Sequence, residues 1–133
     1  MRLVDSNILI FSELEDANEH DLAKNKIKQI PKNVRIMIND IIVSEVFHQL
    51  TKPLGIIAAK RRVENILASA TVQYFPIEVE TVRRALNLAE TRTIRINDAL
   101  IAQHAIDSKA DGILTDNVKD FKKISGLKVL PLR

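Results

Sequence analysis

The alternation of short apolar runs with longer amphipathic segments is the feature that most constrains the fold of this chain. Five runs have the length and composition of strands. They are residues 2–4, 34–38, 72–75, 112–115 and 128–130. Strands separated by helices of ten or more residues form a parallel sheet with helices on both faces. We therefore predict an α/β fold, although a single sequence leaves the order of the strands open.

Helices are predicted between these strands, at residues 17–30, 41–50, 53–70, 78–91 and 98–109. Asp40 is the expected N-cap of the second helix, and Pro53 suits the first turn of the third. The last helix is apolar on nearly all sides, which predicts that it is largely buried. No repeat, low-complexity tract or linker divides the chain, so we expect residues 1–133 to form a single domain.

The composition excludes several classes of protein. The chain has no cysteine, which removes disulfides, thiol catalysis and cysteine-ligated zinc. Its three glycines form neither a dinucleotide-binding motif nor a P-loop. Aromatic residues are only 4% of the chain, so binding of RNA on a run of aromatic side chains is disfavoured. The net charge of +3 permits a nucleic-acid partner but does not by itself indicate one.

Nothing in the sequence predicts a membrane protein. No stretch reaches the roughly 18 apolar residues that a membrane span requires. The N-terminal segment MRLVDSNILIF is interrupted too early by acidic residues to be a signal peptide. We expect a cytoplasmic protein without membrane contact.

Several carboxylates stand where a parallel sheet places its ligands, beyond the carboxyl ends of the strands. Asp5 follows the first strand, Asp116 follows the fourth, and Asp98 begins the buried helix. Each also has a structural explanation, since an Asp caps a helix, favours its first turn or forms an Asx-turn. Glu45 lies in mid-helix, where an isolated Glu is usually exposed. Position alone leaves both interpretations of these acids open.

The histidines do not complete a metal site of another kind. Glu45 and His48 form a single E-x-x-H motif, whereas a di-iron bundle needs two such motifs and an all-α fold. His20 and His104 have no partner pattern. Acids in four separate segments, without a Cys or His set, instead predict oxygen ligands for Mg²⁺ or Mn²⁺. Such sites hydrolyse phosphodiester bonds with metal-activated water.

Four short motifs, spread over nearly the whole chain, match one family. They are Asp5-Ser6-Asn7, Ser44-Glu45-Val46, Asp98-Ala99-Leu100-Ile101-Ala102 and Thr115-Asp116-Asn117-Val118-Lys119-Asp120-Phe121. Each is weakly specific, but four in order at suitable spacing are strongly specific. The chain resembles the PIN-domain ribonucleases, in particular the VapC-like toxins of prokaryotic type II toxin–antitoxin systems.

This resemblance implies a three-layer α/β/α fold with about five parallel strands. It implies a Mg²⁺- or Mn²⁺-dependent endoribonuclease that cleaves single-stranded RNA. It also implies two protein partners, a cognate antitoxin encoded beside the toxin and a second copy of the chain in a homodimer.

The resemblance further implies roles for particular residues. Asp5 and Asp98 correspond to the principal metal ligands, and Glu45 to a third acid that binds the metal directly or through water. Asn7 is expected to orient Asp5, and Thr115 to support the site from the last core strand.

The fourth acid is where this sequence departs from many relatives, which have Asp at the position of Asn117. Others have Asn there and an acid three residues further on, and this chain follows that form. Asp120 is therefore the expected fourth metal ligand, with Asn117 beside it in the site. If the strand continued through Asp116, strand alternation would point that side chain away from its neighbours.

Basic residues are candidates for contact with the RNA backbone. They are Lys60, Arg61, Arg62, Arg92 and Arg95. For each of them taken singly, an ordinary solvated helix surface is the stronger explanation.

Two other classes of function remain to be compared with a nuclease. One is a catalytically silent PIN-like module that binds RNA or a protein. The other is a phosphotransfer domain, but a dehalogenase-like phosphatase needs D-x-D at Asp5 and a receiver needs paired acids at the first strand. The sequence Asp5-Ser6-Asn7 satisfies neither requirement.

Overall fold

A computed structural model describes all of residues 1–133 and contains one sheet of five parallel strands. The strands are β1 (Arg2–Val4), β2 (Ile36–Ile38), β3 (Val72–Tyr74), β4 (Ile113–Thr115) and β5 (Val129–Pro131). Their order is β3-β2-β1-β4-β5, and every neighbouring pair is parallel. The prediction of an α/β fold with about five parallel strands is confirmed.

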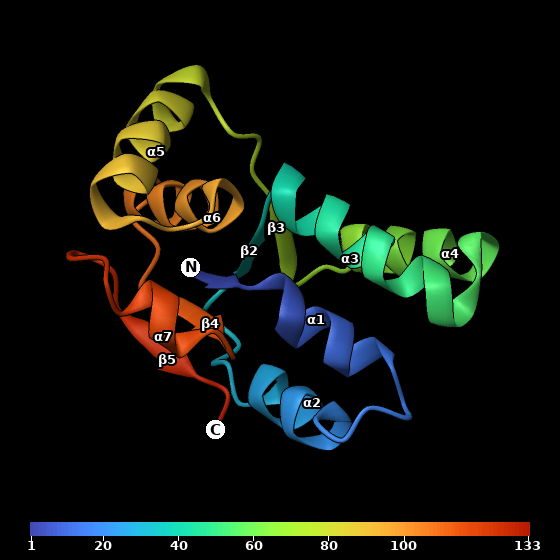
Figure 1. The fold of residues 1–133 in the computed structure, drawn as a ribbon. Helices are drawn as coiled ribbons and strands as arrows, with labels where there is room; N and C mark the ends of the chain where they lie inside the picture. Colours follow the sequence, from blue (N-terminus) through green and yellow to red (C-terminus); the bar gives the residue numbers. More distant parts are fainter.

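Seven helices connect the strands. They are α1 (Ser6–Glu13), α2 (His20–Lys28), α3 (Asp40–Leu54), α4 (Ile56–Ala68), α5 (Val79–Arg92), α6 (Ile96–Asp107) and α7 (Val118–Phe121). In Figure 1, α1–α4 lie on one side of the sheet and α5–α7 on the other. No helix combines the length and the apolar character that crossing a bilayer would require.

This layering follows from the path of the chain. From β1 to β3 each connection moves toward one edge of the sheet, and from β3 to β4 and on to β5 each moves toward the other. Because parallel crossovers are right-handed, the reversal of direction places the two sets of helices on opposite faces. β1 and β4 are neighbours in the sheet, and the connections that follow them run toward opposite edges. Ligands bind at this kind of switch point in α/β sheets.

Burial agrees with the apolar runs of the sequence. Leu3, Val4, Met37 and Ile113 in the three central strands are fully buried, whereas β3 and β5 at the edges are partly exposed. Strands covered on both faces need apolar side chains at successive positions, which explains why these runs do not alternate.

Two details of the helix boundaries were predicted wrongly. The N-cap of α3 is Asn39, whose side chain accepts a hydrogen bond from the Ile42 N–H, and Asp40 is already the first helical residue. Pro53 lies in the last turn of α3 rather than the first turn of α4. Gly55, with φ of +83°, separates the two helices. A positive φ costs glycine little, so the chain turns there and not at the proline.

Helix α6 is buried on most sides, as its composition predicted, and carries the buried His104. The Asn39 amide donates through Nδ2 to His104 Nδ1 at 3.0 Å, while its Oδ1 caps α3. Because the capping bond fixes the amide orientation, Nδ1 must accept and the neutral ring carries its proton on Nε2. This contact joins the start of α3 to α6.

We expect His104 to contribute a loss of stability as the pH falls below about 6.5, against the opposite contribution of the buried Asp5. Burial lowers the pKa of His104 from 6.5, although the charges of Asp40, Asp107 and Glu78 oppose the shift. On acidification the unfolded chain therefore takes up a proton on His104 at a higher pH than the folded protein does. Protonation also turns Nδ1 into a donor that faces the Asn39 amide, itself a donor. Urea unfolding at pH 7.5 and 5.5 would measure the effect.

The variant His104→Gln serves as the comparison. It should be less stable than the wild type by about 1–3 kcal/mol at pH 7.5, because the Asn39 amide loses its partner. It should lose less further stability on acidification. The exposed His48, changed to Gln, should retain the wild-type pH dependence. Equal acid sensitivity of the wild type and His104→Gln would contradict the explanation.

Candidate active site

Asp5 stands at the switch point, directly after β1. Its side chain accepts hydrogen bonds from the Ser6 N–H at 2.8 Å, from Thr115 Oγ1 at 2.6 Å and from Asn7 Nδ2 at 3.2 Å. Asp5 is only 4% exposed. It caps α1 and also faces the end of β4, so the two interpretations that its sequence position left open are compatible.

Burial dominates the ionisation of Asp5 and raises its pKa to about 6. The hydrogen bonds from Thr115 and Ser6 lower the pKa, and the negative charges of Glu45 and Asp98 raise it further. A carboxylate in this state carries charge that its protein neighbours neutralise incompletely. It is therefore a candidate to hold a cation.

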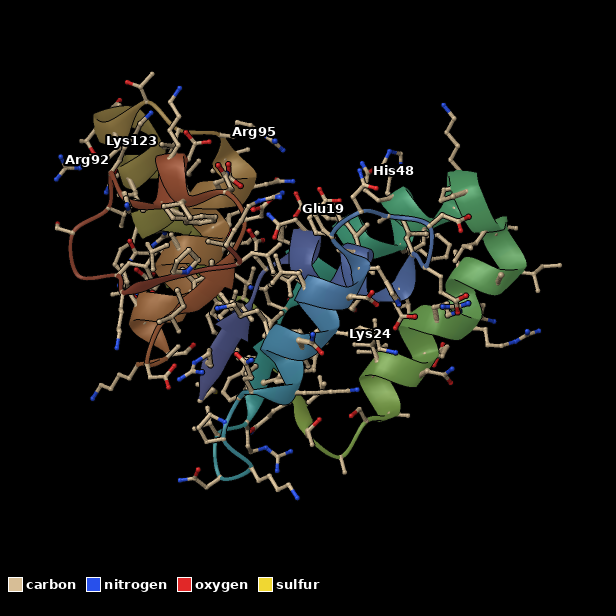
Figure 2. All side chains as sticks on the ribbon, turned by 90° about the horizontal axis from the view of Figure 1, so that it is seen from below. Glu19, Lys24, His48, Arg92, Arg95 and Lys123 are labelled. Carbon is tan, nitrogen blue, oxygen red and sulfur yellow. The ribbon has the colours of Figure 1, made fainter.

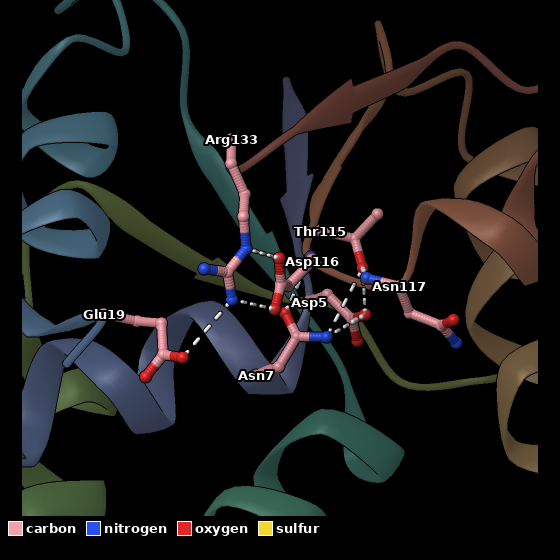
Figure 3. A network of polar contacts seen from close by, with 7 residues as sticks. All are labelled: Asp5, Asn7, Glu19, Thr115, Asp116, Asn117 and Arg133. Atoms are coloured by element: carbon pink, nitrogen blue, oxygen red, sulfur yellow. Dashed lines mark hydrogen bonds and ion pairs between the residues drawn. The ribbon is translucent and has the colours of Figure 1, made fainter. Parts of the chain in front are cut away.

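Asn7 and Thr115 connect Asp5 to the segment after β4 (Figure 3). Asn7 donates to Asp5 through Nδ2, and its Oδ1 accepts the Asp116 N–H at 3.1 Å. Thr115 Oγ1 donates to Asp5 and accepts the Asn117 N–H at 2.9 Å. These two side chains fix the orientation of the Asp5 carboxylate, which is the geometry that an orienting role requires.

Glu45 approaches Asp5 from α3 and is not an ordinary surface glutamate. Ser6 Oγ donates to its Oε1 at 2.7 Å, and Asn97 Nδ2 donates to its Oε2 at 3.3 Å. The Arg95 guanidinium lies 4.0 Å from Oε2. The side chain is 22% exposed, so Glu45 is held at the edge of the site by contacts from α1 and α6.

Asp98 lies in the first turn of α6 and is 8% exposed. Burial raises its pKa, Arg95 lowers it, and the charges of Glu45 and Asp120 raise it again. Asn117 Nδ2 lies 3.5 Å from its Oδ2. Asp98 therefore contacts the loop after β4 through Asn117, and the charges of Glu45 on α3 and Asp120 on α7 act on it.

The two candidates for the fourth acid differ in their surroundings. Asp120, in α7, acts on the pKa of Asp98, and its own nearest cation is Lys123 at 3.6 Å. β4 ends at Thr115, so strand alternation does not reach Asp116. Its carboxylate is held by Arg133 instead, with two contacts of 3.0 Å.

Sequence reasoning gave no role to four residues that complete this network. Ser6 and Asn97 hold Glu45 and are adjacent to predicted acids, which is the signal that could have identified them. Arg133 joins Asp116 to Glu19, which lies 3.3 Å away in the turn before α2 (Figure 3). No local pattern indicates Arg133 or Glu19, because their contact spans more than a hundred residues.

The predicted basic residues are divided between two parts of the molecule. Arg95 adjoins Glu45, and Arg92 ends α5. Figure 2 shows both along the same edge as His48 and Lys123, with Arg92 at the far end. Lys60, Arg61 and Arg62 lie on α4, with no contact to the carboxylates. Arg62 is paired with Glu13 at 2.9 Å.

The donor set fits a hard divalent cation, although no three His, Asp or Glu side chains are close enough together in this structure to hold one. Asp5, Glu45, Asp98 and Asp120 offer only oxygen ligands. The charges of Glu45 and Asp98 raise the pKa of Asp5, and those of Glu45 and Asp120 raise the pKa of Asp98. Mg²⁺ keeps several waters and often uses only one or two carboxylates together with substrate phosphates. A preassembled set of three ligands is therefore not required.

The PIN domain family model matches residues 2–127, and the chain belongs to this family. The structure is similar to VapBC-1 from nontypeable Haemophilus influenzae, with 23% identity, a TM-score of 0.76, and 98% of this chain and 97% of that chain covered. It is also similar to VapBC2 from Rickettsia felis bound to promoter DNA, with 21% identity, a TM-score of 0.77 and the same coverage.

A third similar structure is that of Mycobacterium tuberculosis VapC20, a toxin that cleaves the sarcin–ricin loop. Its identity to this chain is 15%, its TM-score is 0.78, and 90% of this chain and 92% of that chain are covered. No curated protein sequence matches the chain. The family match and these structures confirm the expected three-layer PIN fold.

Proposed function

We propose that this protein is a metal-dependent endoribonuclease that hydrolyses phosphodiester bonds in single-stranded RNA. The observation that carries the proposal is the group of buried or half-buried carboxylates at the switch point of a PIN fold. The similarity to a toxin described as cleaving a ribosomal RNA loop supports RNA as the substrate.

In this proposal each side chain of the site has a task. When bound, Mg²⁺ or Mn²⁺ supplies a Lewis acid that activates water and neutralises charge in the transition state. Asp5 and Asp98 would hold the ion, with Glu45 and Asp120 as direct or water-mediated ligands. Asn7 and Thr115 orient Asp5. Ser6 and Asn97 hold Glu45 in place.

The direct test is metal-dependent cleavage of a single-stranded RNA. We expect no cleavage in excess EDTA and recovery when Mn²⁺ or Mg²⁺ is added beyond the chelator. Calorimetric titration of the protein with Mn²⁺ should show binding below millimolar concentrations. Absence of both binding and cleavage would instead favour the silent RNA- or protein-binding module.

We also propose that the protein acts as the toxin of a type II toxin–antitoxin pair in the cytoplasm, and that it forms a homodimer. Several similar structures are described as toxin–antitoxin complexes, which supports an antitoxin partner. A small open reading frame beside this gene, whose product inhibits cleavage, is the expected finding. Light scattering of the purified protein would measure the size of the assembly.

A further inference from the structure

A polar hollow adjoins the carboxylates and shares Glu45 with them. Its volume is about 360 Å³, and its walls come from α1, α3 and the start of α6. Ile10 is the only hydrophobic residue in the lining. Small-molecule sites usually begin at roughly 300 Å³, so the space suits one nucleotide and not a duplex.

The hollow shares a wall with the candidate active site. Ser6, Glu45 and Asn97 line it, and the same three residues form the hydrogen bonds that hold the Glu45 carboxylate. A molecule in the hollow would thus contact Glu45, one of the four carboxylates. A nucleotide bound there would be next to the site that is proposed to cut the strand.

The other side of the hollow presents polar groups without partners in the chain. His48 and Gln49 are exposed on α3 and form no side-chain hydrogen bond within the protein. Arg95, 74% exposed, has only the 4.0 Å contact with Glu45. Its guanidinium therefore retains donors for another anion. Figure 2 shows His48 and Arg95 along the same edge of the molecule.

A larger hollow of about 420 Å³ elsewhere lacks these properties. It lies between α1, α2 and α4, and five of its 15 lining residues are hydrophobic. Its Arg62 already pairs with Glu13. None of the four predicted metal ligands lines it. The smaller hollow differs from the larger one because it has unpaired hydrogen-bond donors next to a carboxylate of the site.

The groups in the smaller hollow match the parts of a single-stranded nucleotide. A guanidinium binds a phosphate through charge-assisted hydrogen bonds. An amide can read the edge of an unpaired base, and an imidazole ring can stack on its face. Since the chain has few aromatic residues and none in this lining, His48 is the ring available for stacking.

We propose that this hollow binds one RNA nucleotide adjacent to the scissile phosphate, with Arg95 on a phosphate and with His48 and Gln49 selecting the base. The proposal rests on the proposed ribonuclease function, because it extends the substrate path of that site. It assigns a binding role to Gln49 and His48, which no sequence motif indicated.

The experiment uses two variants, Arg95→Gln and the double variant His48→Ala/Gln49→Ala. Binding of a fluorescent single-stranded RNA hexamer is measured by anisotropy in EDTA, where cleavage is absent. Cleavage sites in an RNA library with a randomised single-stranded region are then determined with Mn²⁺. Arg83→Gln, an exposed arginine on α5, and Gln73→Ala, on edge strand β3, are the matched controls.

We expect Arg95→Gln to weaken hexamer binding and raise KM about tenfold, the scale of one lost contact with a strand. The double variant should lose its base preference at a single position flanking the cut. Neither change should weaken Mn²⁺ binding, and the controls should behave as the wild type.

Unchanged hexamer affinity in Arg95→Gln, or an unchanged base preference in the double variant, would overturn the subsite. Failure of the proposed function has a different result, since the wild type would then cleave no RNA with any metal. In that case the hexamer measurement still decides whether the hollow binds RNA. Because all three side chains are exposed, thermal melting should show that every variant folds.

Discussion

Replacement of Asp98 by Asn is expected to lower the rate of RNA cleavage at least about 100-fold, since even groups that only support a metal ligand cost 10–100-fold when removed. Asp98 is buried in the first turn of α6, close enough to Glu45 and Asp120 for their charges to raise its pKa. Asn keeps the shape of the side chain but removes the charge that would hold the cation. Asp5→Asn should have an effect of the same size.

The fold should survive both changes. The ionised form of Asp5 destabilises the metal-free protein above its pKa of about 6, because stability that is present at low pH is lost as this buried group ionises. Replacing Asp5 by Asn therefore removes the free-energy cost of burying this charge. Single-turnover cleavage, Mn²⁺ calorimetry and thermal melting would separate loss of chemistry from loss of structure.

Asp21→Asn is the matched control, since Asp21 is an exposed acid in the first turn of α2. It removes the same charge from a helix start away from the site. Cleavage by Asp98→Asn at the wild-type rate would show that the site is assigned incorrectly.

Asp120→Asn is expected to reduce activity more than Asp116→Asn, by about tenfold against less than about threefold. The charge of Asp120 reaches Asp98, whereas Arg133 holds the Asp116 carboxylate through two contacts of 3.0 Å. An acid that is paired in this way is less available to a cation. Comparison of kcat and of Mn²⁺ affinity in the two variants measures the difference.

The opposite order of effects would mean that the Arg133 pair opens when metal or RNA binds. A third variant, Arg133→Gln, would then distinguish the cause. If Asp116 becomes a ligand on release, this variant should bind Mn²⁺ more tightly than the wild type, and Arg133→Gln/Asp116→Asn should not.

Local patterns predicted the secondary structure well because they report burial directly. Leu3 and Val4 are apolar in succession since β1 is covered on both faces, and the apolar circumference of α6 reflects its position against the sheet. The cap of α3 was assigned wrongly because Asn39 and Asp40 are both good caps. The choice between them depends on His104, 65 residues away, which holds the Asn39 amide.

The candidate site was predictable in part. The motifs that resemble the PIN family made Asp5, Glu45 and Asp98 candidates, but nothing local shows that Glu45 is half-buried in mid-helix. That burial requires Ser6 and Asn97, which come from other helices. The choice between Asp116 and Asp120 depends similarly on Arg133, which contacts Asp116 only after β5 has paired with β4.

By itself, then, the sequence determined the class of fold, the positions of the strands and the acids of interest, since these depend on periodicity and on residue type. The tertiary structure alone decided which acids lie close together, which are paired with basic side chains and which are buried away from water. Those properties depend on distances between segments far apart in the chain, such as Asp5 and Thr115, which are separated by 110 residues. The polar hollow beside Glu45 has the same origin, because its walls belong to three helices that only the folded sheet brings together.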